Sequence, residues 1–168
     1  MPLHLTLQEL IRNPIAEAQW QEWFARWWEI LEPEDFLLST RPEAAELTLR
    51  LTDEAEMQQL NHDWRGLDKP TDILSFSALE GSQLHPEEDL IYLGDVAIGI
   101  PIAEAQAQAE GHGLDVELAW LASHGLLHLL GWEHGDEASL EAIIEKQLAL
   151  LKAVGMEYAF GAEEDSNL

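Results

Sequence analysis

Three of the seven histidines in the chain lie within eleven residues, in the segment HGLLHLLGWEH. If this segment begins as a helix, His124 and His128 project from one face, one turn apart. Both imidazoles can then bind one zinc ion at about 2.0–2.1 Å from each ring nitrogen. Gly131 can adopt backbone angles that other residues avoid, so the chain can turn there and bring His134 back to the ion. Three protein ligands leave a fourth position for water, which is typical of a catalytic zinc site.

The same spacing of histidines occurs in the metzincin proteases, whose signature is HExxHxxGxxH. The residue at the position of the general-base glutamate is Gly125 here. Without that carboxylate proteolysis is disfavoured, so either another residue is the base or a metal hydroxide suffices. Glu133 is the nearest acidic residue in the sequence, and its alternative role is a hydrogen bond to an imidazole N–H. A metal-dependent peptide or amide hydrolase is therefore a second hypothesis.

Hydrophobic periodicity predicts the elements that position these residues. Alternating or continuous apolar runs predict strands over 4–8, 46–52, 73–76 and 90–98. Helical spacing, with Pro and Gly at the expected ends, predicts helices over 14–31, 53–64, 101–111, 115–130 and 136–154. A polar loop is expected over 80–89. Because the strands precede most of the helices, we expect an α+β fold in a single domain spanning 1–168.

The helix predicted over 14–31 carries four of the seven tryptophans, Trp20, Trp23, Trp27 and Trp28. Such a row of rings could stack nucleic-acid bases, but only Arg26 is interleaved with it. The favoured interpretation is a helix whose apolar face packs against the core.

The chain is strongly acidic, with 33 Asp and Glu against 8 Lys and Arg and a net charge of −25. This balance excludes tight, indiscriminate binding of nucleic acid through a broad basic face. The absence of cysteine suits a reducing compartment. The N-terminus lacks the pattern of a signal peptide and no apolar run is long enough to span a membrane, so we expect a cytoplasmic protein without a membrane partner.

Three ordered blocks resemble the YbeY family of bacterial endoribonucleases. HGLLHLLGWEH at 124–134 is similar to the family pattern HGxLHLxG[YF]DH, with Trp132 and Glu133 as departures. NHDWRGLDKPTDILSF at 61–76 resembles the block NxxxRxxxxPT[DN]VLSF with an aromatic before the arginine, and LGDVAI at 93–98 resembles LGD[IL]xI. The resemblance covers about residues 46–155. The flanking segments carry no family motif: they are a strand and tryptophan-rich helix in 1–45 and an acidic tail in 156–168.

This resemblance implies a small mixed sheet packed with about five helices, and a metal-site helix like that of the metzincins. It also implies a zinc-dependent, single-strand-specific endoribonuclease that matures ribosomal RNA, including the 3′ end of 16S rRNA, and acts in ribosome quality control. One zinc ion per chain would be held by His124, His128 and His134. The expected partners are precursor ribosomal RNA, the small ribosomal subunit and basic ribosomal proteins, and not DNA.

The resemblance also implies that Arg65 acts catalytically on RNA, since a guanidinium suits the charge that develops on a scissile phosphate. A salt bridge to a nearby aspartate is the alternative role for Arg65; the candidates are Asp63, Asp68 and Asp72. His62 and Lys69 are expected to add positive potential nearby. Asp72, Ser75 and Asp95 match family positions, but each has a structural alternative. A third hypothesis is a non-catalytic ribosome-assembly factor with structural zinc.

Overall fold

A four-stranded mixed sheet underlies the structure, a computed structural model that describes residues 2–31, 43–79 and 90–159. Its strands, in the spatial order β1-β2-β4-β3, are β1 (Leu3–Glu9), β2 (Ala44–Thr52), β3 (Ile73–Ser77) and β4 (Leu90–Gly99). β1, β2 and β4 run parallel, whereas β3 pairs antiparallel with β4 at one edge. Each strand extends the range predicted from the sequence by at most two residues at either end.

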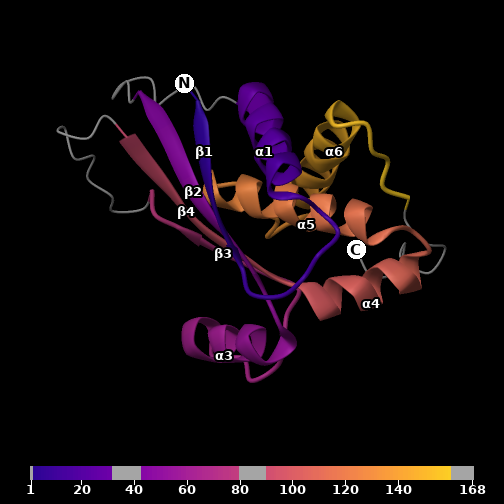
Figure 1. Cartoon of the computed structure of the whole chain (residues 1–168). Helices are drawn as coiled ribbons and strands as arrows, with labels where there is room; N and C mark the ends of the chain where they lie inside the picture. The colour runs from indigo at the N-terminus through magenta and orange to yellow at the C-terminus, as the bar shows by residue number, and fades with distance from the viewer. Residues whose placement is uncertain (1, 32–42, 80–89, 160–168) are drawn as a thin grey trace.

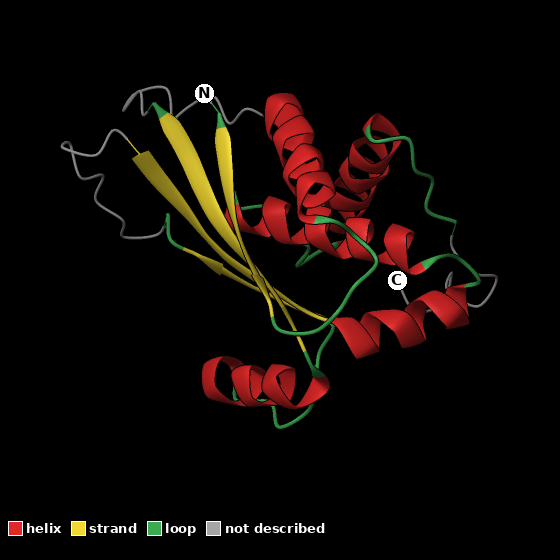
Figure 2. Cartoon of the chain, in the orientation of Figure 1, coloured by secondary structure: helices red, strands yellow, loops and turns green. Residues whose placement is uncertain are grey.

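Helices cover both faces of this sheet (Figure 1 and Figure 2). The described helices are α1 (Glu17–Leu31), α3 (Glu54–Arg65), α4 (Ile100–Glu110), α5 (Leu114–Leu129) and α6 (Glu137–Ala153). In Figure 1, α1, α5 and α6 lie on one face, α3 lies on the other, and α4 continues from the end of β4. The predicted α+β class and mixed sheet are confirmed, and the five predicted helices are all present in the described part of the chain.

The tryptophan-rich helix α1 is a core element, as the sequence analysis favoured. Trp20 and Trp27 are fully buried, and the indole N–H of Trp27 donates to the backbone oxygen of Leu150 on α6, at 2.9 Å. The helix begins at Glu17 and not at Pro14, because Asn13 organises the preceding turn. Its side-chain oxygen accepts from the Ile15 backbone N–H at 3.0 Å and from the Trp20 indole at 3.2 Å.

Two predicted segments, the polar loop over 80–89 and the end of the acidic tail over 160–168, lie outside the described residues. Within 2–31, 43–79 and 90–159, no helix has both the length and the apolar character needed to cross a bilayer.

Helix α5 lies unusually close to the sheet at Gly125. A Cβ atom at this position would be 2.7 Å from Cγ1 of Val96 on β4 and 3.1 Å from Cδ1 of Ile73 on β3. The hydroxyl groups of Ser75 and Ser77 on β3 also donate to backbone oxygens of α5, at 3.4 and 2.9 Å. Ser75 therefore links strand to helix, and not strand to strand. Position 125 faces the sheet, which leaves no space there for the glutamate of a metzincin.

We predict that Gly125→Ala destabilises the protein. Val96 is β-branched and stiff, so the added methyl group overpacks the contact at a cost of about 1–3 kcal/mol. The better helix propensity of alanine offsets at most about 1 kcal/mol of this. The free energy of unfolding, measured by urea denaturation, should therefore fall.

Gly135→Ala is the matched control, because nothing lies within 4 Å of its added Cβ. Its effect should be within about 0.5 kcal/mol, as for most surface substitutions. If Gly125→Ala were as stable as the unmodified protein, the close approach of α5 to the sheet would be wrong.

Candidate active site

The three histidines of the HGLLHLLGWEH segment converge in space. One ring nitrogen from each of His124, His128 and His134 lies within 4.8 Å of the others. The Nε2 atoms of His124 and His128 are 2.8 Å apart, and the His134 ring centroid is 5.5 and 5.1 Å from those of the other two. A cluster of this kind can bind a metal ion, and His134 is its exposed member.

Local backbone geometry produces this convergence. His124 and His128 lie one turn apart on α5, which ends at Leu129. Gly131 then adopts a positive φ of 95°, and the N–H of Trp132 donates to the oxygen of Leu127 at 3.0 Å. This closed turn reverses the chain and returns His134 to the helix face, as the glycine at this position predicts.

Gln147 of α6 orients His124 from behind. It is 1% exposed, and its amide contacts the backbone oxygen of Trp120 at 3.1 Å and Nδ1 of His124 at 3.0 Å. Because a backbone oxygen only accepts, the amide nitrogen must face Trp120, so its oxygen faces His124. Nδ1 of His124 is therefore the protonated nitrogen, and its Nε2 lone pair points towards the other histidines.

Sequence reasoning missed Gln147, although a usable pattern was present. Residue 147 continues the helical spacing of the buried positions of α6, Ile143, Leu150 and Leu151, and is polar. A buried amide within an apolar stripe needs hydrogen-bond partners, and so indicates a specific role.

Their surroundings favour the neutral form of two of the histidines, His124 and His128. Burial lowers the pKa of His124, and burial together with the neighbouring His124 and His134 rings lowers the pKa of His128 to about 4. At neutral pH both imidazoles thus carry a free lone pair, the form in which histidine binds a metal.

Arg65 shares a cleft of about 430 Å³ with the three histidines. The cleft lies between α5 and the segment that leads from the end of α3 to β3, and Thr71, Asp72, Ser75 and Ser77 also line it. The structure therefore brings the predicted catalytic arginine and the predicted metal ligands together.

The guanidinium group of Arg65 forms no ion pair or hydrogen bond with any residue that the structure describes. The three aspartates considered as its salt-bridge partners bond elsewhere: Asp63 to Gln59 at 2.8 Å, Asp68 to Gln58 at 3.1 Å and Asp72 to Gln106 at 3.1 Å. Its positive charge is therefore available to a ligand in the cleft.

Asp72 supplies the one carboxylate among the described lining residues of this cleft. Its charge offsets a small part of the lowering that burial causes in the pKa of His124, and its Oδ2 accepts from the amide of Gln106 at 3.1 Å. Glu133, the nearest acidic residue in the sequence, is exposed and lines a neighbouring pocket with Trp132. Asp72 is therefore a second candidate for the acidic group, beside Glu133.

The two basic residues expected near the site differ in position. Lys69 lines a pocket next to the cleft, and Arg65 and Asp72 line both. His62 is exposed on α3, where its Nδ1 lies 3.3 Å from Asp63, and it lines neither. Lys69 can therefore add positive potential beside the cleft, whereas His62 is turned to solvent.

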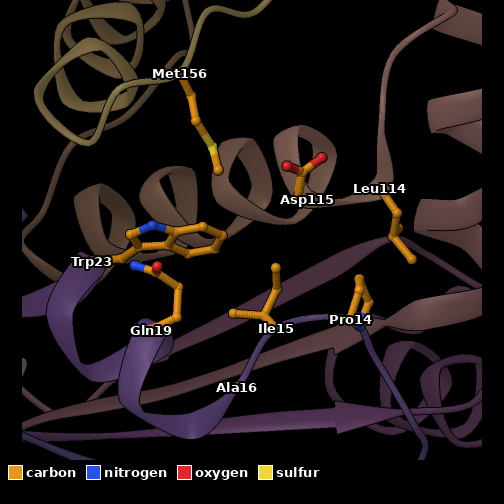
Figure 3. Close-up of a pocket in the computed structure, with 8 residues that line it drawn as sticks. All are labelled: Pro14, Ile15, Ala16, Gln19, Trp23, Leu114, Asp115 and Met156. Carbon is orange, nitrogen blue, oxygen red and sulfur yellow. The ribbon is translucent and has the colours of Figure 1, made fainter.

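A larger pocket of about 570 Å³ lies at the other end of α5. Figure 3 shows Trp23 and Ile15 at its floor, with Leu114 and Asp115 at the start of α5 and Met156 above them. Asp115 is the one ionisable side chain among the described residues that line it. Metal-ligating groups gather in the cleft and not here.

Comparison with known proteins agrees with the blocks noted in the sequence. A family model described as Endoribonuclease YbeY matches residues 7–155. Endoribonuclease YbeY of Gloeobacter violaceus is 47% identical over 157 residues, covering 93% of this chain and 77% of its own. Endoribonuclease YbeY of Synechococcus sp. strain JA-2-3B'a(2-13) is 46% identical, covering 92% of both chains.

The fold is also that of a solved structure. The solution structure of TM1509 from Thermotoga maritima matches with a TM-score of 0.56 and 22% identity, covering 98% of this chain and 93% of the other. With the family model matching most of the chain and relatives nearly half identical along it, the chain belongs to the YbeY family.

Proposed function

We propose that this chain is a zinc-dependent, single-strand-specific endoribonuclease that matures ribosomal RNA. Its relatives carry the name Endoribonuclease YbeY, and cleavage of RNA comes to this chain through its membership of their family. The observation that carries the proposal is the shared cleft, in which three imidazoles face a guanidinium without an acidic partner among the described residues.

The donor set fits zinc. Zinc is borderline soft and accepts imidazole ligands, and three histidines leave one position free for substrate or water. The burial that keeps His124 and His128 unprotonated favours metal binding without prior loss of a proton. When bound, zinc supplies a Lewis acid that polarises a phosphoryl oxygen.

Arg65 binds the scissile phosphate in this proposal. A guanidinium group can donate two parallel hydrogen bonds to phosphate oxygens and stabilise the charge that develops on them. Because no described aspartate neutralises Arg65, the group does not have to break an ion pair before it binds RNA.

In this proposal water attacks the phosphorus, the P–O bond to the departing ribose oxygen breaks, and that oxygen takes up a proton from solvent. Asp72 is the base that accepts the proton of the attacking water. It fills the role that Gly125 cannot, since position 125 faces the sheet, and Glu133 lines a different pocket. The Gln106 amide holds the Asp72 carboxylate in place at 3.1 Å.

The ribosome supplies the docking surface that the protein lacks for free RNA. With a net charge of −25, the surface repels bulk phosphate and attracts basic ribosomal proteins. The positive charge of Arg65 in the cleft is then enough to bind the phosphate group at which the RNA is cleaved. The partners we propose are precursor ribosomal RNA and the small ribosomal subunit.

His128→Ala and Arg65→Ala separate metal binding from catalysis. We expect His128→Ala to lose stoichiometric zinc and cleavage of a single-stranded RNA, because one of three ligands is removed. Arg65→Ala should keep one zinc ion per chain and lose about 10²–10³-fold in cleavage rate, as when a single transition-state donor is removed. Zinc content by mass spectrometry and cleavage on a gel check both.

Arg26→Ala removes an exposed arginine of α1 and is the control, with zinc content and cleavage unchanged. Wild-type cleavage by both test variants would contradict the proposal and favour the non-catalytic assembly factor. Peptide products from an unfolded protein substrate would instead favour the amide hydrolase.

Asp72→Asn should lower kcat about 10²–10⁴-fold, because it removes the proposed general base and keeps the side-chain shape. The zinc content should stay at one ion per chain. Asp115→Asn, an exposed residue at the start of α5 that lines the other pocket, is the matched control and should cleave normally. Unaltered kcat in Asp72→Asn would assign the base elsewhere.

Gln147→Leu should weaken zinc binding about 10–100-fold, the usual effect of removing the group that orients a ligating histidine. Competition with a chromogenic chelator measures the affinity, and the melting temperature of the metal-free protein checks folding. Gln147→Glu keeps an acceptor for Nδ1 of His124 but loses the donor to the Trp120 oxygen, so it should recover part of the affinity and lower the melting temperature. Wild-type affinity in a folded Gln147→Leu protein would show that His124 needs no orienting partner.

A further inference from the structure

Trp64, the last aromatic residue of α3, is 69% exposed and is the most exposed of the large apolar side chains in the described part of the chain. By contrast, the four tryptophans of α1 are buried. Full burial of a large apolar side chain stabilises a protein by about 1.5–3 kcal/mol, so Trp64 contributes little of this to folding. Packing of the hydrophobic core therefore does not explain why a tryptophan occupies this exposed position.

One neighbouring ring holds Trp64 in place without covering it. The ring centroids of Trp64 and Phe76 are 5.6 Å apart and the ring planes are inclined by 60°. An inclined contact supports one ring against the other but does not lie flat over its face. Trp64 thus presents a supported aromatic surface to solvent.

This aromatic pair is continuous with the proposed RNA cleft. Trp64 directly precedes Arg65, and Phe76 lies between Ser75 and Ser77; Arg65 and both serines line the cleft. Successive residues of a strand point to opposite faces, so Phe76 lies on the far side of β3 from the cleft. β3 is the terminal strand of the sheet, and its Ser75 and Ser77 line the cleft together with the histidines.

We infer that Trp64, supported by Phe76, is a stacking site for an unpaired base of the RNA whose phosphate lies in the cleft. The inference rests on the proposed function and adds to it a physical reason for single-strand specificity. An RNA strand that crosses the edge of β3 places a phosphate at Arg65 and a neighbouring base on the indole. In a duplex that base is already stacked on both faces, so it cannot bind Trp64.

The charges around the pair favour a base over a phosphate. Asp95 is exposed on β4 directly opposite Phe76 and carries negative charge. It repels phosphates from this face, whereas stacking needs no charge and tolerates any base. Stacking is therefore a source of affinity open to a protein with a net charge of −25, which lacks a broad basic surface.

Binding of a short oligoadenylate to the full-length, metal-free protein tests the inference, since chelation stops cleavage and stacking needs no metal. Trp64→Leu should weaken binding about 5- to 150-fold, the equivalent of one base–aromatic stack, whereas Trp64→Phe keeps a ring and should retain most of the affinity. Ile30→Ala removes an exposed apolar side chain on α1 and should bind normally. Because Trp64 is exposed, all variants should melt as the wild type does.

Two further measurements identify the contact as stacking. The oligoadenylate should quench tryptophan fluorescence of the wild type, and less so that of Trp64→Phe. Abasic and duplex oligonucleotides of the same length should bind the wild type as weakly as the single strand binds Trp64→Leu.

Equal affinity of the wild type and Trp64→Leu for the single strand, or equal binding of the abasic strand, would overturn the inference. The same measurements distinguish an error in the stacking inference from an error in the proposed nuclease function. If only stacking is wrong, Trp64→Leu binds normally while Arg65→Ala still loses cleavage. If only the nuclease function is wrong, Trp64→Leu weakens binding while the zinc-loaded wild type fails to cleave.

Discussion

The approach of α5 to the sheet at Gly125 is the constraint on which the site depends. With no side chain at this position, the helix backbone lies against Val96 and Ile73, and the hydroxyl groups of Ser75 and Ser77 bond its carbonyl oxygens. Such a contact sets the rotation of α5 about its own axis. The face that carries His124 and His128 is therefore directed into the cleft, while the position of a metzincin glutamate is used for packing.

The electrostatic arrangement follows from the same geometry. Burial keeps His124 and His128 neutral, so these two histidines can offer lone pairs to a metal. Arg65 has no acidic partner among the described residues, and Asp72 is held by an amide. Although the chain has a net charge of −25, this cleft can therefore still bind a phosphate group. Any affinity for RNA outside the cleft must come from uncharged contacts or from a partner such as the ribosome.

Much of this could be predicted from the sequence, because periodicity and spacing are local. The four strands, the five helices, the return of the chain at Gly131 and the joint position of Arg65 and the histidines all follow from local patterns or from the family blocks. The rest depends on contacts between distant segments. Gln147 reaches His124 from another helix, and Asp72 lines the cleft through the path of a loop. Glu133, adjacent to His134 in sequence, lines an adjoining pocket that shares His128 and Ser77 with the cleft.

The central claim is that three imidazoles from one helix and the following turn hold the metal beside Arg65. X-ray absorption spectroscopy at the zinc edge of the zinc-loaded full-length protein tests it most directly. The account predicts three nitrogen ligands at about 2.0–2.1 Å with the multiple-scattering pattern of imidazole, together with one oxygen ligand from water. A zinc ion bound by carboxylate oxygens, or by fewer than three imidazoles, would contradict it.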